Sequence, residues 1–189
     1  MDAAERVREA MAAVPRRAFL PRSQRFFAPV DAPLPIGHGQ TSSQPSTVRA
    51  MLELLDVQEG DRVLDVGAGS GWTTALLAHL TGPTGEVLGV EVVPELARWG
   101  AANVAAAGMP WARLEPAAPG VLGAPDRGPW ARVLVSAEAD ELPEELLDQL
   151  APGGVLVVPV TGRMLRVTAR SVGPLVERFG YYRFVPLVR

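Results

Sequence analysis

The sequence predicts an α/β fold in which helices cover both faces of a mostly parallel sheet. After residue 60, short apolar runs typical of buried strands alternate with stretches in which apolar residues recur at helical spacing. The apolar runs are almost continuous, as expected for strands that are buried on both faces. A glycine-rich turn follows the first run directly. This alternation indicates a parallel-rich sheet between two layers of helices.

Two helices and a long loop are predicted ahead of the sheet. Residues 3–14 carry apolar side chains at helical spacing, which predicts an amphipathic helix that ends at Pro15. Residues 16–45 are expected to form a loop, because five prolines from Pro15 to Pro35 forbid a long helix there. A loop of this length in a compact chain is usually functional. The second helix is predicted from four apolar residues at i, i+3, i+4 and i+7: Val48, Met51, Leu52 and Leu55.

The region after these helices predicts strands and helices in alternation. "RVLDV" is the first expected strand, followed by the glycine turn and a helix. "GEVLGVE" is the next, and Pro94 suits the first turn of the helix after it. A further helix is expected in "ELPEELLDQLAPGG". The remaining strands are expected in "ARVLVSA", "GVLVVPV", "RMLRVTAR" and "YRFVPLV".

The composition excludes several classes of chemistry. The chain has no cysteine and no lysine, which excludes thiolate catalysis, disulfides and Schiff-base mechanisms. Two histidines without a carboxylate cluster predict no metal site. The formal net charge is −3 and the arginines are scattered along the chain, so a nucleic-acid partner is not expected.

The length and the hydropathy pattern predict a single domain inside the cell. The 189 residues fit one domain, in which residues 1–45 supply the N-terminal helix and loop and residues 46–189 the core. The apolar runs are far shorter than the ~20 residues of a membrane-spanning helix. The N-terminus mixes acidic residues and arginines without an unbroken apolar stretch, unlike a secretory signal. We therefore expect a cytoplasmic protein without a membrane partner.

A glycine-rich turn, "VLDVGAGSG", joins the first strand to its helix. Its glycines, Gly67, Gly69 and Gly71, allow the backbone to approach a ligand, and the helix N-terminus offers free N–H groups. Glu91 ends the next strand, 20 residues after Gly71, where a carboxylate can accept both hydroxyls of an adenosine ribose. Together these features predict an adenosyl cofactor, against the alternative of a structural turn without a ligand. Asp65, just before the turn, either takes part in the cofactor site or caps the turn.

The spacing of this turn resembles motif I of the class I S-adenosylmethionine methyltransferases. Its glycines follow the pattern G-x-G-x-G after the acidic Asp65, unlike the G-x-G-x-x-G of NAD-binding proteins. "DAPLPIGHGQTSSQPSTVRAMLELL" is in turn similar to the segment P-L-P-I-G-x-G-Q-T-I-S-x-P of protein-L-isoaspartate O-methyltransferases. The similarity continues in "VPRRAFLP", "GDRVLDVGAGSGW", "LPEELLDQLAPGGVLVVPV" and "YRFVPLV", and so covers nearly the whole chain.

This resemblance implies a fold, a reaction and a site. The implied fold is the Rossmann-like class I methyltransferase fold, with a seven-stranded, mostly parallel sheet. The implied reaction is methyl transfer from S-adenosyl-L-methionine to the α-carboxylate of an L-isoaspartyl residue in a damaged protein or peptide, by a monomeric or weakly associating enzyme. Ser43 matches the serine to which the family's active-site role is assigned. The residues expected to bind the cofactor are Gln40, Thr41, Ser42, Asp65, Gly67, Ala68, Gly69, Gly71, Glu91 and Gly120.

This chemistry suits a chain that is poor in bases. A carboxylate with a pKa near ~3.5 is ionised at neutral pH, so the nucleophile needs no general base. Catalysis then depends on aligning the carboxylate, the methyl group and the sulfur, and on excluding water. The hydroxyl and backbone donors of "GQTSS" suit a loop with that task. The alternative for Ser43 is that it only caps the helix that follows.

Three departures from the family pattern leave other functions open. Ala118-Pro119-Gly120 stands where the family has G-D-G, so adenine binding is expected to be weaker or to come from backbone groups. Ser42 replaces an isoleucine of the family pattern. Arg163 replaces a glutamine, and it either clamps a carboxylate or lies in solvent; the position in solvent is favoured. The alternative functions are an aspartyl O-methyltransferase of a peptide natural-product pathway and a degenerate member that binds without turnover. An NAD oxidoreductase is disfavoured by the glycine spacing.

Overall fold

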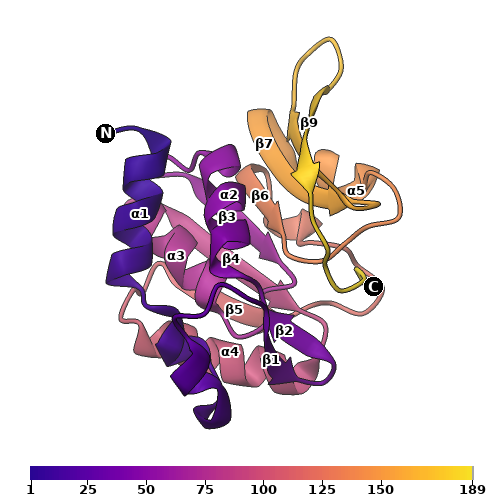
Figure 1. The fold of residues 1–189 in the computed structure, drawn as a ribbon. Helices are drawn as coiled ribbons and strands as arrows, with labels where there is room; N and C mark the ends of the chain where they lie inside the picture. The colour runs from indigo at the N-terminus through magenta and orange to yellow at the C-terminus, as the bar shows by residue number, and fades with distance from the viewer. Residues whose placement is uncertain (189) are drawn as a thin grey trace.

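A seven-stranded sheet forms the centre of the molecule (Figure 1). The computed structural model describes residues 1–188. The strand order is β5-β4-β3-β6-β7-β8-β9, with parallel pairing from β5 to β7 and antiparallel pairing of β8 and β9. This order confirms the predicted Rossmann-like, mostly parallel fold. The strands are Arg62–Val66 (β3), Glu86–Glu91 (β4), Ala112–Pro116 (β5), Trp130–Val135 (β6), Leu150–Val160 (β7), Arg163–Thr168 (β8) and Leu175–Tyr181 (β9).

Helices cover both faces of this sheet (Figure 1). On one face, α1, α2 and α3 enclose the larger core together with apolar residues of the central strands, and α4 lies along β5. On the opposite face, α5 packs against β6 and β7. Within residues 1–188, every helix is too short or too polar to span a membrane. The helices are Ala3–Ala13 (α1), Pro45–Leu55 (α2), Trp72–Thr81 (α3), Pro94–Ala106 (α4) and Glu144–Leu147 (α5).

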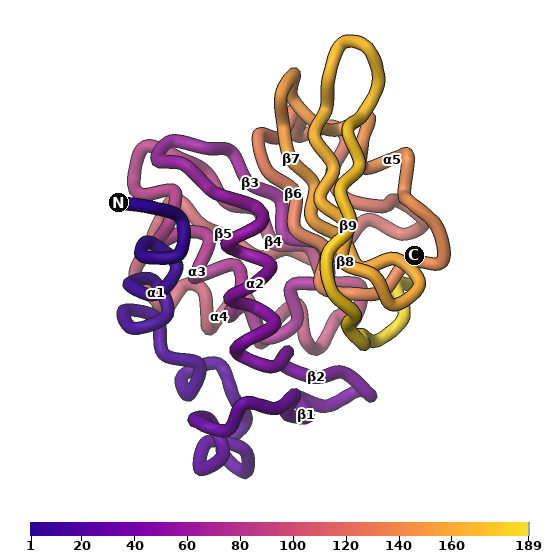
Figure 2. The backbone as a smooth tube through the Cα atoms, turned by 45° about the horizontal axis from the view of Figure 1, so that its top comes forward, coloured from indigo at the N-terminus to yellow at the C-terminus, as the bar shows by residue number. Residues whose placement is uncertain are grey.

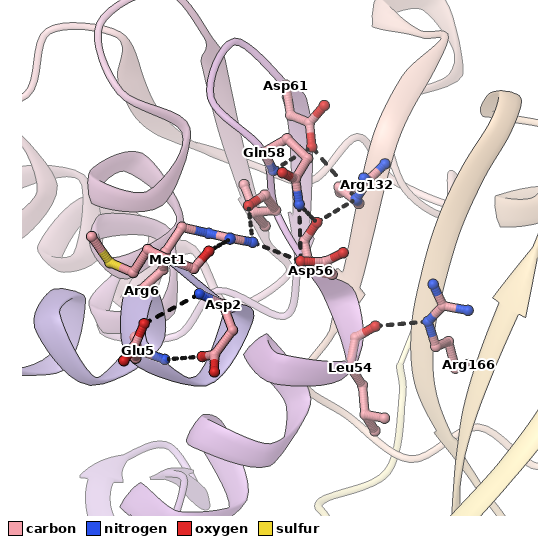
Figure 3. Close-up of polar contacts among 11 residues, drawn as sticks. Met1, Asp2, Glu5, Arg6, Leu54, Asp56, Gln58, Asp61, Arg132 and Arg166 are labelled. Carbon is pink, nitrogen blue, oxygen red and sulfur yellow. Dashed lines mark hydrogen bonds and ion pairs between the residues drawn. The ribbon is translucent and has the colours of Figure 1, made fainter.

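The C-terminal end of α2 is tied to α1 and to the sheet by polar contacts (Figure 3). Arg6 of α1 forms an ion pair with Asp56, the residue after α2, with 2.6 Å between Nη2 and Oδ1. Arg132 of β6 donates to the carbonyl oxygen of Asp56 at 3.2 Å, and Arg166 of β8 donates to that of Leu54 at 2.8 Å. These contacts hold one end of the helix whose first turn borders the candidate site.

The segment predicted as a loop, residues 16–45, contains regular structure, and that prediction was wrong for most of its length. Two 3₁₀-helices lie in its first half, Arg16–Phe19 and Arg22–Phe27. Each begins directly after a proline, because the fixed φ of proline favours a short turn where it forbids a long α-helix. The prolines thus direct this segment into compact turns.

The second half of the same segment is a β-hairpin beside the first turn of α2 (Figure 2). Its strands are Leu34–Gly37 (β1) and Gln40–Ser42 (β2). His38 and Gly39 close it with φ values of +54° and +73°. Positive φ at both turn residues gives the twist that a two-residue hairpin needs. The hairpin carries the predicted site residues Gln40, Thr41 and Ser42 to the carboxyl ends of the central strands.

Two predictions in the C-terminal half were wrong. The helix expected in "ELPEELLDQLAPGG" is a single turn, α5, because its Pro-Gly-Gly end disfavours helix and β7 begins at Leu150. The strand expected in "YRFVPLV" is absent from the described residues: β9 ends at Tyr181, and the chain then leaves the sheet edge. Residues 182–188 cross to the end of β6, where Pro186 bridges to Glu138. This C-terminal segment forms part of the candidate site.

Candidate active site

The glycine turn lies at the carboxyl end of β3, where the backbone bends sharply into α3. Gly67, Gly69 and Gly71 have φ values of +77°, +52° and +83°, which other residues rarely adopt. Gly71 also packs against α4, because a Cβ atom there would lie 2.9 Å from the carbonyl oxygen of Gly100. The turn therefore requires glycine for its conformation and for its contact with α4.

Glu91, the last residue of β4, connects that strand to the glycine turn. Its side chain is buried, at 5% exposure. Oε2 accepts a hydrogen bond from the N–H of Gly69 at 2.8 Å, and Oε1 accepts one from the N–H of Val93 at 2.9 Å. A carboxylate has about four acceptor positions, so both oxygens can still accept a hydroxyl of a ligand. Glu91 thus fixes the turn and faces a ligand site at the same time.

A cleft, which we call the main cleft, lies over the carboxyl ends of β3, β4 and β6. Its walls come from the hairpin, the glycine turn, the loop at residues 117–123 and the C-terminal residues 185–188. It encloses about 650 Å³ of space outside the protein atoms, part of which is open to solvent. The chain leaves β3 toward α3 on one face of the sheet, and it leaves the neighbouring β6 toward α5 on the opposite face. Ligands of open α/β sheets usually bind where such connections diverge.

Most of the predicted site residues lie at this cleft or next to it. The predicted residues that line the main cleft are Gln40, Thr41, Gly67, Gly69 and Glu91. A small hollow beside the cleft is lined by further predicted residues, namely Ser42, Ser43 and Ala68. The predicted residues that border neither are Asp65, Gly71 and Gly120.

An open groove continues from the main cleft between the first turn of α2 and residues 181–185. Ser43 lines both the groove and the small hollow. Among residues 1–188, Arg183 is the charged residue in the groove lining, and no carboxylate of these residues lines the groove. Ser136, the first residue after β6, lines the groove as well as the main cleft and the small hollow. No motif in the sequence singles out Ser136, because a lone serine after a strand is not a functional signal.

The alternative that Ser43 only caps α2 was wrong. The residue in the N-cap position is Gln44, and its side chain makes no capping bond. Asp31, which lies earlier in the chain, supplies the capping bond instead: its Oδ1 accepts from the N–H of Ser46 at 2.8 Å. Its Oδ2 accepts from Nε2 of Gln44 at 3.0 Å. These hydrogen bonds from Gln44 and Ser46 hold the pKa of Asp31 below its usual value. The hydroxyl of Ser43 is therefore not needed by the helix.

Arg16 anchors the hairpin through its guanidinium group, a role that sequence reasoning missed. Its guanidinium donates to the hydroxyl oxygen of Ser42 at 3.0 Å and to the carbonyl oxygens of Ser42, Ala32 and Val30 at 2.8, 3.0 and 3.3 Å. It also lies 5.6 Å from the ring centroid of Trp72. Burial lowers the pKa of Arg16 to about 10, so the side chain stays charged at neutral pH. The serine that replaces the family's isoleucine thus serves this anchor.

Asp65 is fully buried under the glycine turn. Its Oδ2 accepts hydrogen bonds from the hydroxyls of Thr73 and Thr74, both at 2.7 Å, in the first turn of α3. Its Oδ1 has no partner among the described residues. Burial raises the pKa of Asp65 to about 6, and the charge of Glu91 acts in the same direction, against the two hydrogen bonds. Both hydrogen bonds come from side-chain hydroxyls of α3 and not from backbone N–H groups of the turn, so the capping role and the cofactor role of Asp65 both stay predictions.

The other two departures from the family pattern have simple surroundings. Residues 118–120 form a turn in which the N–H of Val121 donates to the carbonyl of Ala118 at 3.1 Å. Arg163 does not lie free in solvent: its guanidinium carbon is 4.0 Å from the ring centroid of Tyr181, which lines the groove. Such stacking stabilises a cation on an aromatic face.

We expect Arg16→Met to destabilise the protein by about 2–4 kcal/mol, because it leaves the buried hydroxyl and carbonyl of Ser42 without a donor and removes the bonds to the partly buried carbonyls of Val30 and Ala32. Arg17→Met is the matched control: Arg17 is exposed and makes one hydrogen bond, to the carbonyl of Arg25. The control should cost less than ~0.5 kcal/mol. Urea unfolding measures both values, and equal losses in the two variants would contradict the anchor role.

Asp65→Asn should remove a specific pH dependence of stability. Between the unfolded pKa near ~3.8 and the folded pKa of about 6, the unfolded chain releases the Asp65 proton while the folded protein retains it. The wild-type free energy of unfolding should therefore fall, relative to that of Asp65→Asn, as the pH rises from 4 to about 6. Above that pH the difference should be constant. Parallel curves across this range would show that Asp65 titrates normally.

Comparison with known proteins identifies close relatives. The family model of Protein-L-isoaspartate(D-aspartate) O-methyltransferase (PCMT) matches residues 1–189. A relative from Aeropyrum pernix named Protein-L-isoaspartate O-methyltransferase is 49% identical over 155 residues, which is 82% of this chain and 60% of that protein. A relative of the same name from Methanopyrus kandleri is 44% identical over 188 residues, 97% of this chain and 83% of that protein.

Solved structures agree with this match. A protein-L-isoaspartate O-methyltransferase structure superposes with a TM-score of 0.84 at 25% identity, over 97% of this chain and 61% of that chain. A Plasmodium falciparum PCMT structure in complex with S-adenosyl-L-homocysteine, at 24% identity, has the same fold, with a TM-score of 0.81 over 97% of this chain and 90% of that chain. The chain therefore belongs to the protein-L-isoaspartate (D-aspartate) O-methyltransferase family.

Proposed function

We propose that this protein transfers a methyl group from S-adenosyl-L-methionine to the α-carboxylate of L-isoaspartyl residues in damaged proteins and peptides. The observation that carries the proposal is the continuity of the main cleft with a groove whose lining includes several hydroxyl groups and, within residues 1–188, no carboxylate. A cofactor in the cleft would then face a peptide carboxylate in the groove. Membership in the family, whose relatives carry this activity in their names, supports the same assignment.

The residues of the main cleft fit an adenosyl ligand. Glu91 would accept the ribose hydroxyls, and the turn at Gly67 and Gly69 would let the protein backbone approach the cofactor closely. The apolar side chains of Val92 and Leu122 would cover the adenine ring. Backbone groups of the loop at residues 117–123 would replace the family's aspartate. S-adenosyl-L-methionine supplies an electrophilic methyl group on a sulfonium.

The reaction needs orientation and no proton transfer. The substrate carboxylate is ionised at neutral pH, and one of its oxygens forms the new bond to the methyl carbon. The carbon–sulfur bond breaks, and its electron pair stays on sulfur. Neither a base nor an acid is consumed, so Ser43 would act by hydrogen bonding to the carboxylate and holding it in line. The lack of carboxylates in the groove lining avoids repulsion of this anionic substrate.

The cellular setting is also part of the proposal. We infer a single methyltransferase domain that works as a monomer in the cytoplasm on protein and peptide substrates. Many of the arginines are neutralised in ion pairs with carboxylates, and the formal net charge is −3, which argues against a nucleic-acid partner.

The direct test is methyl transfer from labelled S-adenosyl-L-methionine to a peptide with one isoaspartate, beside the same peptide with ordinary aspartate. Label on the isoaspartyl peptide alone is the expected result. Cofactor binding without label on either peptide would point to a dedicated peptide substrate. A folded protein that does not bind the cofactor would point to a degenerate member of the family.

Gly69→Arg should abolish cofactor binding. A Cβ atom at this position already lies 3.2 Å from Cδ1 of Ile36 across the cleft, so a long side chain fills the cofactor space. We expect at least a hundredfold loss of S-adenosyl-L-homocysteine affinity in calorimetry. Gly173→Arg is the matched control, because it has a positive φ of +107° and open space around it. Unchanged affinity in Gly69→Arg would refute the cleft assignment.

Ser43→Ala should lower kcat/KM for the isoaspartyl peptide about tenfold or more, the value of one charge-assisted hydrogen bond. The affinity for S-adenosyl-L-homocysteine and the free energy of unfolding should stay close to wild type, since Ser43 does not cap α2. Peptide kinetics, calorimetry and urea unfolding separate these quantities. Proportional losses of stability and activity would mean that the serine is structural.

A further inference from the structure

Ser136 occupies the point at which the sheet divides. β4 and β5 follow β3 on one side of the sheet, and β6 to β9 lie on the other side. The chain after β3 enters α3 on one face, and the chain after β6 runs toward α5 on the opposite face. Ligands bind where such connections diverge. The N–H of Ser136 donates to the carbonyl of Val66 at 2.9 Å, which fixes the serine beside the glycine turn.

Ser136 borders all three hollows of the candidate site: the main cleft, the small hollow and the groove. Thr41 of the hairpin has the same property. The two residues therefore mark the passage between the cleft and the groove. In the proposed reaction the methyl group has to cross from one to the other at this passage.

The hydroxyl groups around this passage divide into two sets. The hydroxyl of Ser42 accepts from Arg16, and the hydroxyl of Ser46 accepts from Gln44 at 2.9 Å. The second set makes no hydrogen bond within residues 1–188. It includes Thr41, Ser43 and Ser136, together with Thr47, Tyr181 and Tyr182 of the groove and Ser70 of the small hollow. A carboxylate only accepts hydrogen bonds, so unengaged hydroxyl donors are the groups that it requires. The free set lies where the substrate would be.

We propose that Ser136 is a substrate-contacting residue whose hydroxyl donates a hydrogen bond to the isoaspartyl α-carboxylate. Ser43 would approach the same group from the hairpin, and Ser136 would approach it from the end of the sheet. With its backbone N–H held by Val66, Ser136 presents its hydroxyl from a rigid element, which favours exact alignment. This inference rests on the proposed function and adds a second contact for the same carboxylate.

The test uses Ser136→Ala, with Ser136→Thr to restore the hydroxyl and Ser171→Ala, in the exposed turn between β8 and β9, as the control. We expect Ser136→Ala to lower kcat/KM for the isoaspartyl peptide about tenfold. The affinity for S-adenosyl-L-homocysteine should stay within twofold of wild type. Ser136→Thr should recover most of the loss, and Ser171→Ala should match wild type.

A second measurement tests the contact itself. Calorimetry on the S-adenosyl-L-homocysteine complex gives the Kd of the isoaspartyl peptide and of its α-carboxamide analogue, neither of which reacts. Hydrogen bonds to a charged acceptor are about twice as strong as neutral ones. Ser136→Ala should therefore weaken the carboxylate peptide about tenfold and the carboxamide peptide about threefold. Equal weakening of both would overturn the assignment.

The remaining outcomes are distinct. Wild-type methylation with an unchanged kcat/KM in Ser136→Ala would overturn the Ser136 assignment and leave the proposed function intact. A loss of cofactor affinity as large as the loss of kcat/KM would also overturn it, because Ser136 would then serve the cofactor. Absence of methylation by the wild-type enzyme, with the cofactor bound, would overturn the proposed function and the inference with it.

Discussion

The ligand side of the molecule depends on the buried carboxylate of Glu91. Each of its oxygens accepts one backbone N–H, from Gly69 in the turn after β3 and from Val93 at the start of α4. A buried carboxylate is costly unless it is hydrogen-bonded, and these two bonds offset that cost. They also fix the relative position of two loops that emerge from neighbouring strands. One side chain therefore holds the shape of the main cleft and offers its free acceptor positions to a ligand.

The hairpin and the start of α2 are held in a comparable way by two separated side chains. Arg16 holds the backbone and hydroxyl of Ser42, and Asp31 holds the backbone N–H of Ser46. Ser43 lies between these anchored residues. The chain around it is fixed by partners on both sides while its own hydroxyl stays unengaged. A site that must align a substrate without proton transfer gains from this arrangement, because orientation is its main contribution.

Patterns that are local in the sequence predicted the structure well. Apolar runs, the glycine turn and the acid 20 residues after it predicted β3, β4 and the cleft between them. Contacts between distant residues were not predictable in this way. Arg16 forms a hydrogen bond with Ser42, 26 residues later in the chain, and no periodic pattern in the sequence predicts such a pair. The apolar run at residues 182–188 resembles a strand, but it does not add a strand to the sheet. It crosses instead to the end of β6, where Pro186 bridges to Glu138.

The C-terminal segment has a consequence for the order in which the site forms. Residues 185–188 make one wall of the main cleft, and two backbone hydrogen bonds of 2.7 Å link Val185 and Leu187 to Glu138. The opposite wall comes from the hairpin near the start of the chain. During synthesis, the sheet and the glycine turn emerge from the ribosome before this last wall does. Until residues 185–188 have emerged, the main cleft therefore lacks one of its walls.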